Sequence, residues 1–372
     1  MRHAFRITIA TLALALFALA GWSAQSTRET NPVGPGPDSQ TESTLRVPTP
    51  KAGRARPLIV VLADNAGTET TDFVIPYGVF KESAVADVLT VSIEPGMIKL
   101  MPALQVRADM TTARFDASTP AGADILIVPA MHRTDNPSVL AWVRAQAAKG
   151  ALVVSICDGA WILANAGLLR DRTATSHWYS LDRLKNQYPS TTWVRNRRYV
   201  VDRNVMTTTG VTASIPASLA LVEAIAGRPV ADATAKRLGA AAWSPEHDST
   251  PFRLTAGRVA VAAANLLAFW RHETVEVPVE DGFDEISVAL TVDAWSRTYR
   301  SEAAATSAAG IVRSRRGLLL IPAVLARSGQ HIVLPYAGAS VAALDVTLEN
   351  IASRYGVATA DFAALQLEYP GQ

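Results

Sequence analysis

The sequence predicts an α/β protein whose main domain is a three-layer fold, a parallel sheet covered by helices on both faces. Two observations predict this class. From Pro57 onward, short apolar runs rich in Val, Ile and Leu alternate with segments of helical pattern. The apolar runs are continuous instead of alternating with polar residues, which is typical of parallel strands buried on both faces. We therefore expect helices above and below one central sheet.

Length and composition limit the function classes. The chain has 372 residues, of which 49% are hydrophobic and 18% charged, values typical of a globular protein with two domains. The net charge of +2 is not gathered into a long run of Lys and Arg, so nucleic-acid binding has no electrostatic support. The single cysteine, Cys157, excludes an internal disulfide and leaves that residue to be explained by packing or by chemistry.

The N-terminal segment has the pattern of a secretory signal. Arg2 and Arg6 precede an apolar run at positions 7–20, which small residues follow. We assign residues 1–24 to a signal peptide, or to a signal anchor if it stays uncleaved, although the run is shorter than the roughly 20 residues of a membrane span. Residues 25–56 are rich in Pro, Gly, Ser and Thr and are expected to be a flexible linker. The sequence therefore predicts an exported, periplasmic protein, or one tethered to a membrane at its N-terminus.

The predicted main domain covers residues 57–230. Its expected strands are the runs PLIVVLA, VLTVSI, DILIVPA and ALVVSIC, and its expected helices are TTDFVIPYGVFKES, SVLAWVRAQAAKG and GAWILANAGLL. Further strands near Thr192, Tyr199 and Val205 lead into a helix over 215–226, which Gly227 ends in the usual helix-stop position.

The most informative segment is the one that joins the strand ALVVSIC to the next helix. Cys157 lies at the carboxyl end of that strand, the edge at which ligands bind in open parallel sheets. The N-terminus of the following helix lowers the pKa of a thiol placed there, and the backbone N–H groups of Asp158 and Gly159 are candidate donors to an oxyanion. The pattern is typical of a nucleophile elbow.

Several motifs in order carry a resemblance to a known family. They are Thr71 to Phe80, Cys157-Asp158-Gly159-Ala160, Ala166-Gly167-Leu168-Leu169 and Ala174-Thr175-Ser176-His177-Trp178. Together they resemble the DJ-1/PfpI family, and among its members the isonitrile-hydratase-like and AraC-regulator-associated proteins most. The resemblance implies a flavodoxin-like parallel sheet of the class I glutamine-amidotransferase type, with Cys157 as the nucleophile.

The same resemblance implies the partners of the cysteine. It places Asp72 beside Cys157 as a hydrogen-bonding or proton-carrying acid, and Glu69 is the second choice for that role. A carboxyl buried beside a thiolate has a raised pKa, which suits a general acid. Gly78 and His177 are further candidates for the crevice, although His177 also fits a structural role at a strand end. Asp72 also fits a plain helix cap.

The chain departs from the family pattern at three places. Asp158 stands where members usually carry Thr or His, and its charge raises the pKa of the neighbouring thiol. Ile75 replaces a Gly before Pro76, and Pro216 follows Ser214-Ile215 where relatives carry an acid. These changes leave open whether Cys157 is catalytic.

The C-terminal third gives weaker signals. Residues 231–271 are expected to be a helical connection, and residues 272–372 an α/β region with strand, helix, strand and helix in turn. Asp284 and Glu285 open a helix after a strand, as Glu69 and Asp72 do, which suggests a degenerate second copy without a nucleophile. A homodimer and an intramolecular pseudo-dimer both fit this pattern.

Two functions remain from the sequence. The first is a cysteine-dependent hydrolase or hydratase that acts on a small electrophile. The second is a non-catalytic periplasmic module that binds a small-molecule ligand, related to the sensor domain of AraC-type regulators. No dinucleotide, P-loop or metal-ligand motif occurs, so we expect neither a cofactor nor a metal.

Overall fold

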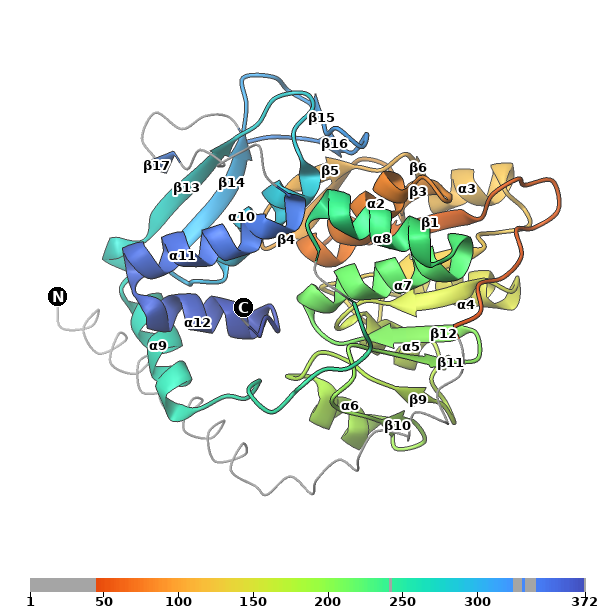
Figure 1. The fold of residues 1–372 in the computed structure, drawn as a ribbon, viewed down its shortest axis with the longest axis horizontal. Coiled ribbons are helices and arrows are strands. Elements are labelled where there is room, and N and C mark those ends of the chain that lie inside the picture. The colour runs from red at the N-terminus through yellow and green to blue at the C-terminus, as the bar shows by residue number, and fades with distance from the viewer. Residues whose placement is uncertain (1–44, 241–242, 324–329, 332–338, 371–372) are drawn as a thin grey trace, which may run out of the picture.

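A computed structural model describes residues 45–240, 243–323, 330–331 and 339–370 (Figure 1). The predicted signal over residues 1–24 and the first part of the predicted linker, residues 25–44, lie outside these described residues. Among the helices that the model describes, none is both long and apolar enough to cross a membrane.

A seven-stranded sheet forms the centre of the first domain. Its order is β11-β12-β8-β7-β1-β3-β6, and every neighbouring pair is parallel except β11 with β12. The strands are β1 (Leu58–Ala63), β3 (Asp87–Ser92), β6 (Met110–Thr111), β7 (Ile125–Val128), β8 (Leu152–Ser155), β11 (Tyr199–Asp202) and β12 (Val205–Thr208). The mainly parallel sheet confirms the predicted fold class.

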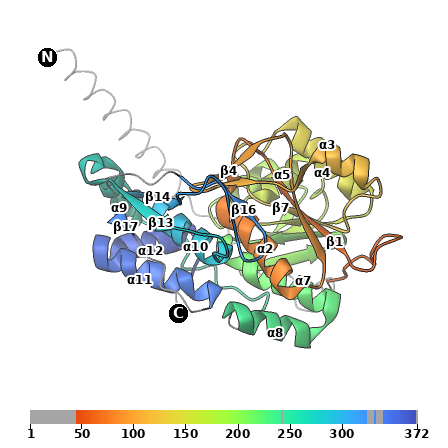
Figure 2. The same cartoon turned by 90° about the horizontal axis from the view of Figure 1, so that it is seen from above.

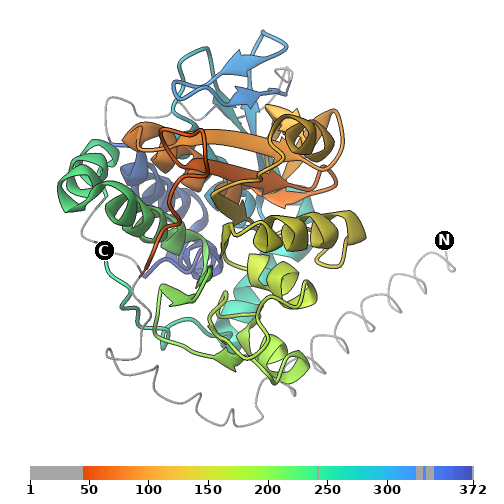
Figure 3. The same cartoon turned by 90° about the vertical axis from the view of Figure 1, so that its right-hand side faces the viewer.

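Helices cover both faces of this sheet, as Figure 3 shows. Alternate residues of β1 enter two separate cores: Ile59 and Val61 pack on one face, and Val60 and Leu62 on the other. The first face carries α2 (Thr70–Ser83), α7 (Ser214–Ala226) and α8 (Arg228–Leu238). The second carries α3 (Thr112–Ser118), α4 (Pro137–Ala148) and α5 (Gly159–Asn165). The domain is therefore three-layered, because helices pack on both faces of the sheet.

Several short elements were not expected from the sequence. They are β2 (Thr68–Glu69), the hairpin β4 (Met97–Met101) and β5 (Gln105–Arg107), strand β9 (Thr173–Ala174) and helix α6 (Leu181–Gln187). Strand β9 pairs with β10 (Thr192–Trp193), the strand that was predicted near Thr192. Helix α9 (Ala256–Leu267) and the short η2 (Phe269–Arg271) then lead to the C-terminal region, so the predicted connection is helical in part.

The first half of the C-terminal region repeats the topology of the first domain. It runs β13 (Glu273–Pro278), α10 (Glu285–Ser296), β14 (Ser301–Thr306), the hairpin β15 (Val312–Arg313) and β16 (Leu319–Leu320), and β17 (Gln330–His331). The parallel sheet order β17-β13-β14 matches the order β7-β1-β3, and a hairpin follows the second strand in both regions.

The second half repeats the helical end of the first domain. The short η3 (Ser340–Ala342) leads into α11 (Ala343–Tyr355) and α12 (Val357–Gln366), just as η1 (Val211–Ala213) leads into α7 and α8. Gly227 and Gly356 join the helices of each pair with φ of 86° and 90°, and each lies 16 positions after the start of its 3-10 helix. The described part of the second copy has no counterpart of β8 or of Cys157, so the repeat is degenerate.

The two copies pack against each other through equivalent elements, which Figure 2 shows from above. Helices α2 and α10 lie in contact, and β16 pairs antiparallel with β5 to join the two hairpins in one small sheet. A Cβ built on Gly78 would lie 2.7 Å from atoms of Ile286. Gly78 is therefore needed where the two helices approach closely.

Candidate active site

Cys157 lies in the turn between β8 and α5, at the carboxyl edge of the central sheet. Its φ of 54° is left-handed, a conformation that costs energy in a residue with a side chain. Two hydrogen bonds hold this backbone: Cys157 N donates to Thr208 Oγ1 at 3.1 Å, and Ser176 Oγ donates to Cys157 O at 3.2 Å. The residue is only 7% exposed. The predicted elbow geometry is thus present.

Gly159 supports the elbow by its small size. Its N–H donates to Ile156 O at 2.8 Å, so this group is not free for an oxyanion as the sequence suggested. A Cβ at this position would lie 2.2 Å from Val128 O, because the turn packs directly on the end of β7. The expectation of a donor at Gly159 is therefore wrong, and its role is steric.

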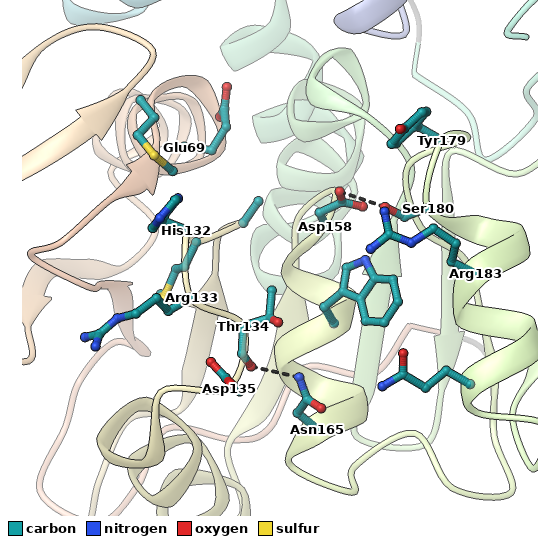
Figure 4. Close-up of a pocket in the computed structure, with 15 residues that line it drawn as sticks. Glu69, His132, Arg133, Thr134, Asp135, Asp158, Asn165, Tyr179, Ser180 and Arg183 are labelled. Atoms are coloured by element: carbon teal, nitrogen blue, oxygen red, sulfur yellow. Dashed lines mark hydrogen bonds between the residues drawn. The ribbon is translucent and has the colours of Figure 1, made fainter. Parts of the chain in front are cut away.

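The carboxylate of Asp158 contacts two serines. Ser180 Oγ donates to Asp158 Oδ2 at 2.8 Å (Figure 4). Ser176 Oγ lies 3.3 Å from Asp158 Oδ1. The backbone N–H of Asp158 hydrogen-bonds the Cys157 thiol and lowers the thiol pKa, while the carboxylate raises it. Asp158 therefore acts on the thiol in two opposite ways, through its carboxylate and through its backbone N–H.

Glu69 and Asp72 lie together at the start of α2. Glu69 caps the helix, because Oε2 accepts from Asp72 N at 2.5 Å. Asp72 is fully buried, and its Oδ2 accepts from Ala130 N at 3.1 Å. Its Oδ1 is buried and has no hydrogen-bond partner in the described part of the chain. An unpaired buried carboxyl oxygen is costly, so this atom is a candidate for contact with a ligand or a transferred proton.

Arg297 brings a positive charge to these acids from the second copy. Arg297 Nη2 lies 2.7 Å from Glu69 Oε1, and Nε lies 2.8 Å from Asp293 Oδ1, one turn earlier in α10. Thr71 Oγ1 also donates to Glu69 and lies 3.3 Å from Asp293 Oδ2. Neither Arg297 nor Asp293 was predicted from the sequence, although the acidic start shared by α2 and α10 pointed to this helix.

The surroundings keep the thiol protonated. Burial raises the pKa of Cys157 well above its ordinary value, and Asp72, Asp158 and Glu69 raise it further. The positive end of the seven-residue helix α5 does not overcome these effects. The lowered thiol pKa expected from the helix N-terminus is therefore wrong for the resting site, because burial and three acids outweigh one helix end.

Asp72 is placed to exchange a proton near neutral pH. Burial raises its pKa to about 7, with a smaller contribution from Asp158, while the Ala130 N–H and Arg297 oppose the rise. Burial also raises the pKa of Glu69, helped by Asp72 and Asp293 and opposed by Arg297. The predicted raised pKa of the acid is confirmed, since several carboxyls share one guanidinium away from water.

A cavity of about 590 Å³ opens beside the elbow at the ends of the strands. Figure 4 shows its wall, which includes Glu69, Asp158, Trp161, Tyr179 and Arg183. Cys157 does not line it directly but lies next to Asp158, which does. The volume is enough for a small molecule.

Two predicted crevice residues lie elsewhere. Gly78 lies at the contact between α2 and α10 and does not line the cavity. The ring of His177 faces the C-terminal segment, with Nε2 3.2 Å from Gln366 O, so the structural alternative for this residue is correct. Both predictions failed for the same reason. The second copy packs on Gly78 and on His177, which were expected to face the crevice.

Comparison with known proteins agrees with this geometry. The model of the DJ-1/PfpI family matches residues 58–224. A deglycase of Pyrococcus horikoshii is 31% identical over 155 residues, which make up 41% of this chain and 86% of the deglycase. The chain belongs to the DJ-1/PfpI family. The matched part ends within α7, so the C-terminal region lies outside it.

Other relatives of this DJ-1/PfpI protein have different functions. An isonitrile hydratase of Pseudomonas putida is 32% identical over 118 residues, 32% of this chain and 50% of the hydratase. The transcriptional regulator GbdR of Pseudomonas aeruginosa is 28% identical over 147 residues, 39% of this chain and 38% of the regulator. The chain thus spans half or less of the length of these two relatives.

Two solved structures also match part of the chain. Drosophila melanogaster DJ-1β matches with a TM-score of 0.45 and 22% identity, over 50% of this chain and 100% of that one. A ThiJ/PfpI family protein of Pseudomonas syringae matches with a TM-score of 0.48 and 22% identity, over 65% of this chain and 95% of that one.

Proposed function

We propose that this DJ-1/PfpI protein is a cysteine-dependent hydratase or hydrolase that adds water to a small electrophile bound beside Cys157. One observation carries the proposal. The strained elbow places a buried thiol near Asp72, an acid with a pKa of about 7 and one carboxyl oxygen without a partner in the described chain. Backbone strain and an unpaired buried acid both destabilise a fold, and both features are found most often at functional sites.

The reaction follows from the two protonation states. Asp72 is ionised above about pH 7 and takes the thiol proton as Cys157 Sγ bonds to the electrophilic carbon of the substrate. Asp72 then gives that proton to the substrate. A water molecule attacks the same carbon, the S–C bond breaks, and the thiol regains a proton. The net change is addition of one water molecule, with no oxidant, metal or cofactor.

Two other groups support this reaction. The Asp158 N–H, which hydrogen-bonds the sulfur, stabilises negative charge that develops there. Arg297, paired with Glu69 and Asp293, holds Glu69 in position as the cap of α2 and so helps to place Asp72. The second copy thus contributes to the site from within the same chain.

Turnover of a defined electrophile tests the proposal. The chain is incubated with cyclohexyl isocyanide, whose hydration gives a formamide, and, because of the deglycase relatives, with a glycated peptide. We expect product with the unaltered chain and with Gly310→Ala, a control glycine with open space around it, and none with Cys157→Ser. Equal rates for Cys157→Ser and the unaltered chain would overturn the proposal.

A second candidate function is binding of a small ligand without chemistry. The raised thiol pKa and the position of Cys157 behind the cavity wall favour it, as does the similarity to transcriptional regulators. It predicts that a ligand found by thermal-shift screening stabilises Cys157→Ala as much as the unaltered chain. Trp161→Ala, in the cavity wall, would abolish that stabilisation.

We also propose the cellular location and the assembly. The N-terminal sequence supports export to the periplasm, with a membrane tether where the signal is not cleaved. The packing of α2 on α10 and of β5 on β16 supports an intramolecular pseudo-dimer. A second chain then has no access to this face, and sedimentation equilibrium should give the mass of one chain.

A further inference from the structure

Helix α9 exposes a continuous apolar surface. All of its exposed residues are Gly, Ala or Leu: Ala256, Gly257, Ala260, Ala264, Leu266 and Leu267. Phe269 and Trp270 in η2 extend this surface and are 73% and 71% exposed. A surface helix normally presents polar residues to water, whereas the solvent-exposed face of α9 is apolar.

Two neighbouring segments enlarge this surface. Asn265 Nδ2 donates to Thr298 O at 2.9 Å and lies 3.2 Å from Thr359 Oγ1, which brings the exposed Tyr299 and Val357 close to α9. We call Leu266, Leu267, Phe269, Trp270, Tyr299 and Val357 the α9 patch. These six belong to nine exposed large hydrophobic side chains in the described part of the chain. Such a concentration marks an interaction surface.

The charge around the α9 patch is mainly positive. Residues 253–272 include Arg253, Arg258 and Arg271 with His272, and they include no Asp or Glu. The exposed acid on the adjacent helix α12 is Asp361. Trp, Tyr and Phe favour the boundary between lipid and water, and arginines beside them attract anionic headgroups.

From these observations we propose that the α9 patch binds the surface of an anionic phospholipid bilayer. In Figures 1 and 2, α9 lies at the outer edge of the C-terminal region, away from the central sheet. The apolar run at positions 7–20 is followed by 24 residues before Leu45, which span at most about 80 Å when extended. A bilayer that held this run would therefore lie within about that distance of Leu45. Two weak contacts together give stable attachment where one does not.

A fluorescent label on the α9 patch tests the proposal independently of the N-terminal segment. The full chain with Cys157→Ser and Leu267→Cys is labelled with an environment-sensitive dye and mixed with vesicles of phosphatidylglycerol and phosphatidylethanolamine. We expect a blue shift in the emission of this label. The matched control, Cys157→Ser with Ile311→Cys, carries the dye at an exposed apolar position outside the α9 patch and should show none. An unshifted label at position 267 on floated vesicles, or no flotation at all, would overturn the proposal.

A pair of variants tests which side chains enter the lipid. In the chain labelled at position 267, Phe269→Ser with Trp270→Ser should lower the partition coefficient of the label into vesicles by about tenfold or more. Met97→Ser with Ile311→Ser should leave this partition coefficient unchanged. All four side chains are exposed, so melting temperatures should match that of the unaltered chain. The unaltered chain could instead form a dimer in the absence of vesicles. If Phe269→Ser with Trp270→Ser abolished that dimer, a second copy of the chain would cover this surface, and the proposal would be contradicted.

Discussion

Arg297 Nη2 lies 2.7 Å from Glu69 Oε1, and this ion pair joins two residues 228 positions apart in the sequence. It connects the end of α10 in the second copy to the start of α2, beside Asp72 and the nucleophile elbow. A repeat that carries no cysteine of its own therefore still takes part in the site of the first.

Replacing Arg297 should destabilise the fold more at high pH than at low pH. Arg297→Met leaves Glu69 and Asp293 buried without a counter-ion, which typically costs about 3–5 kcal/mol of unfolding free energy. Burial raises the pKa of Glu69, so protonation of Glu69 relieves part of this cost at pH 5 and the loss should grow towards pH 8. Urea unfolding at both values measures it.

Arg195→Met is the matched control for this effect. Arg195 pairs with Asp182 at the same distance of 2.7 Å, but both side chains are partly exposed, so the expected loss is about 1 kcal/mol or less. Equal losses for the two arginines would contradict a special role of Arg297.

The folded chain should react slowly with iodoacetamide at pH 8. Burial and three acids raise the pKa of Cys157, so little thiolate is present. Asp158→Asn removes one of these charges and should speed alkylation, whereas unfolding in urea should restore ordinary thiol reactivity. The rate of mass increase reports this single cysteine alone. Rapid alkylation of the folded chain at pH 7 would refute the description of the resting thiol.

Asp72→Asn should stabilise the fold above neutral pH. In the unaltered chain the pKa of Asp72 rises from 3.8 to about 7 on folding, so the protonated form is the one that the fold favours. The contribution of Asp72 to stability is full below pH 3.8 and is lost as the pH rises to about 7. The asparagine avoids this loss of up to about 4 kcal/mol, because one pKa unit corresponds to about 1.4 kcal/mol. Melting curves of both proteins at pH 4 and pH 8 measure the difference, which should be near zero at pH 4.

Gly78→Ala should weaken the contact between the two copies. The added methyl group would meet Ile286 at 2.7 Å, and overpacking of this kind costs about 1–3 kcal/mol. Gly310→Ala, with nothing within 4 Å of the new methyl, should be neutral in the same denaturation experiment. A neutral Gly78→Ala would show that α2 and α10 are not tightly packed.

The sequence predicted most elements of the first domain because its patterns are local. The run TTDFVIPYGVFKES coincides with α2, and the strand before Cys157 ends in a left-handed residue, as an elbow requires. The weak echo at Asp284 and Glu285 correctly pointed to a second copy. The hairpin of β4 and β5 was missed because its strands are short and half exposed.

The site was predicted less completely, because its decisive contacts are long-range. No local pattern shows that Arg297 reaches Glu69, or that α10 occupies the space beside Gly78. The same packing of the second copy keeps Gly78 and His177 out of the crevice, where the sequence had placed them. The thiol pKa depends on burial and on summed charges, and neither can be obtained from the spacing of residues along the chain.

The pH dependence of kcat/KM for isonitrile hydration, in the unaltered chain and in Asp72→Asn, tests the central claim most directly. If Asp72 takes the proton of a neutral Cys157 thiol, kcat/KM rises through about pH 7 and then stays level, and Asp72→Asn lowers it by about 100-fold or more at the plateau. A profile that keeps rising past pH 9 with the thiolate, or that is the same in both proteins, would contradict the account.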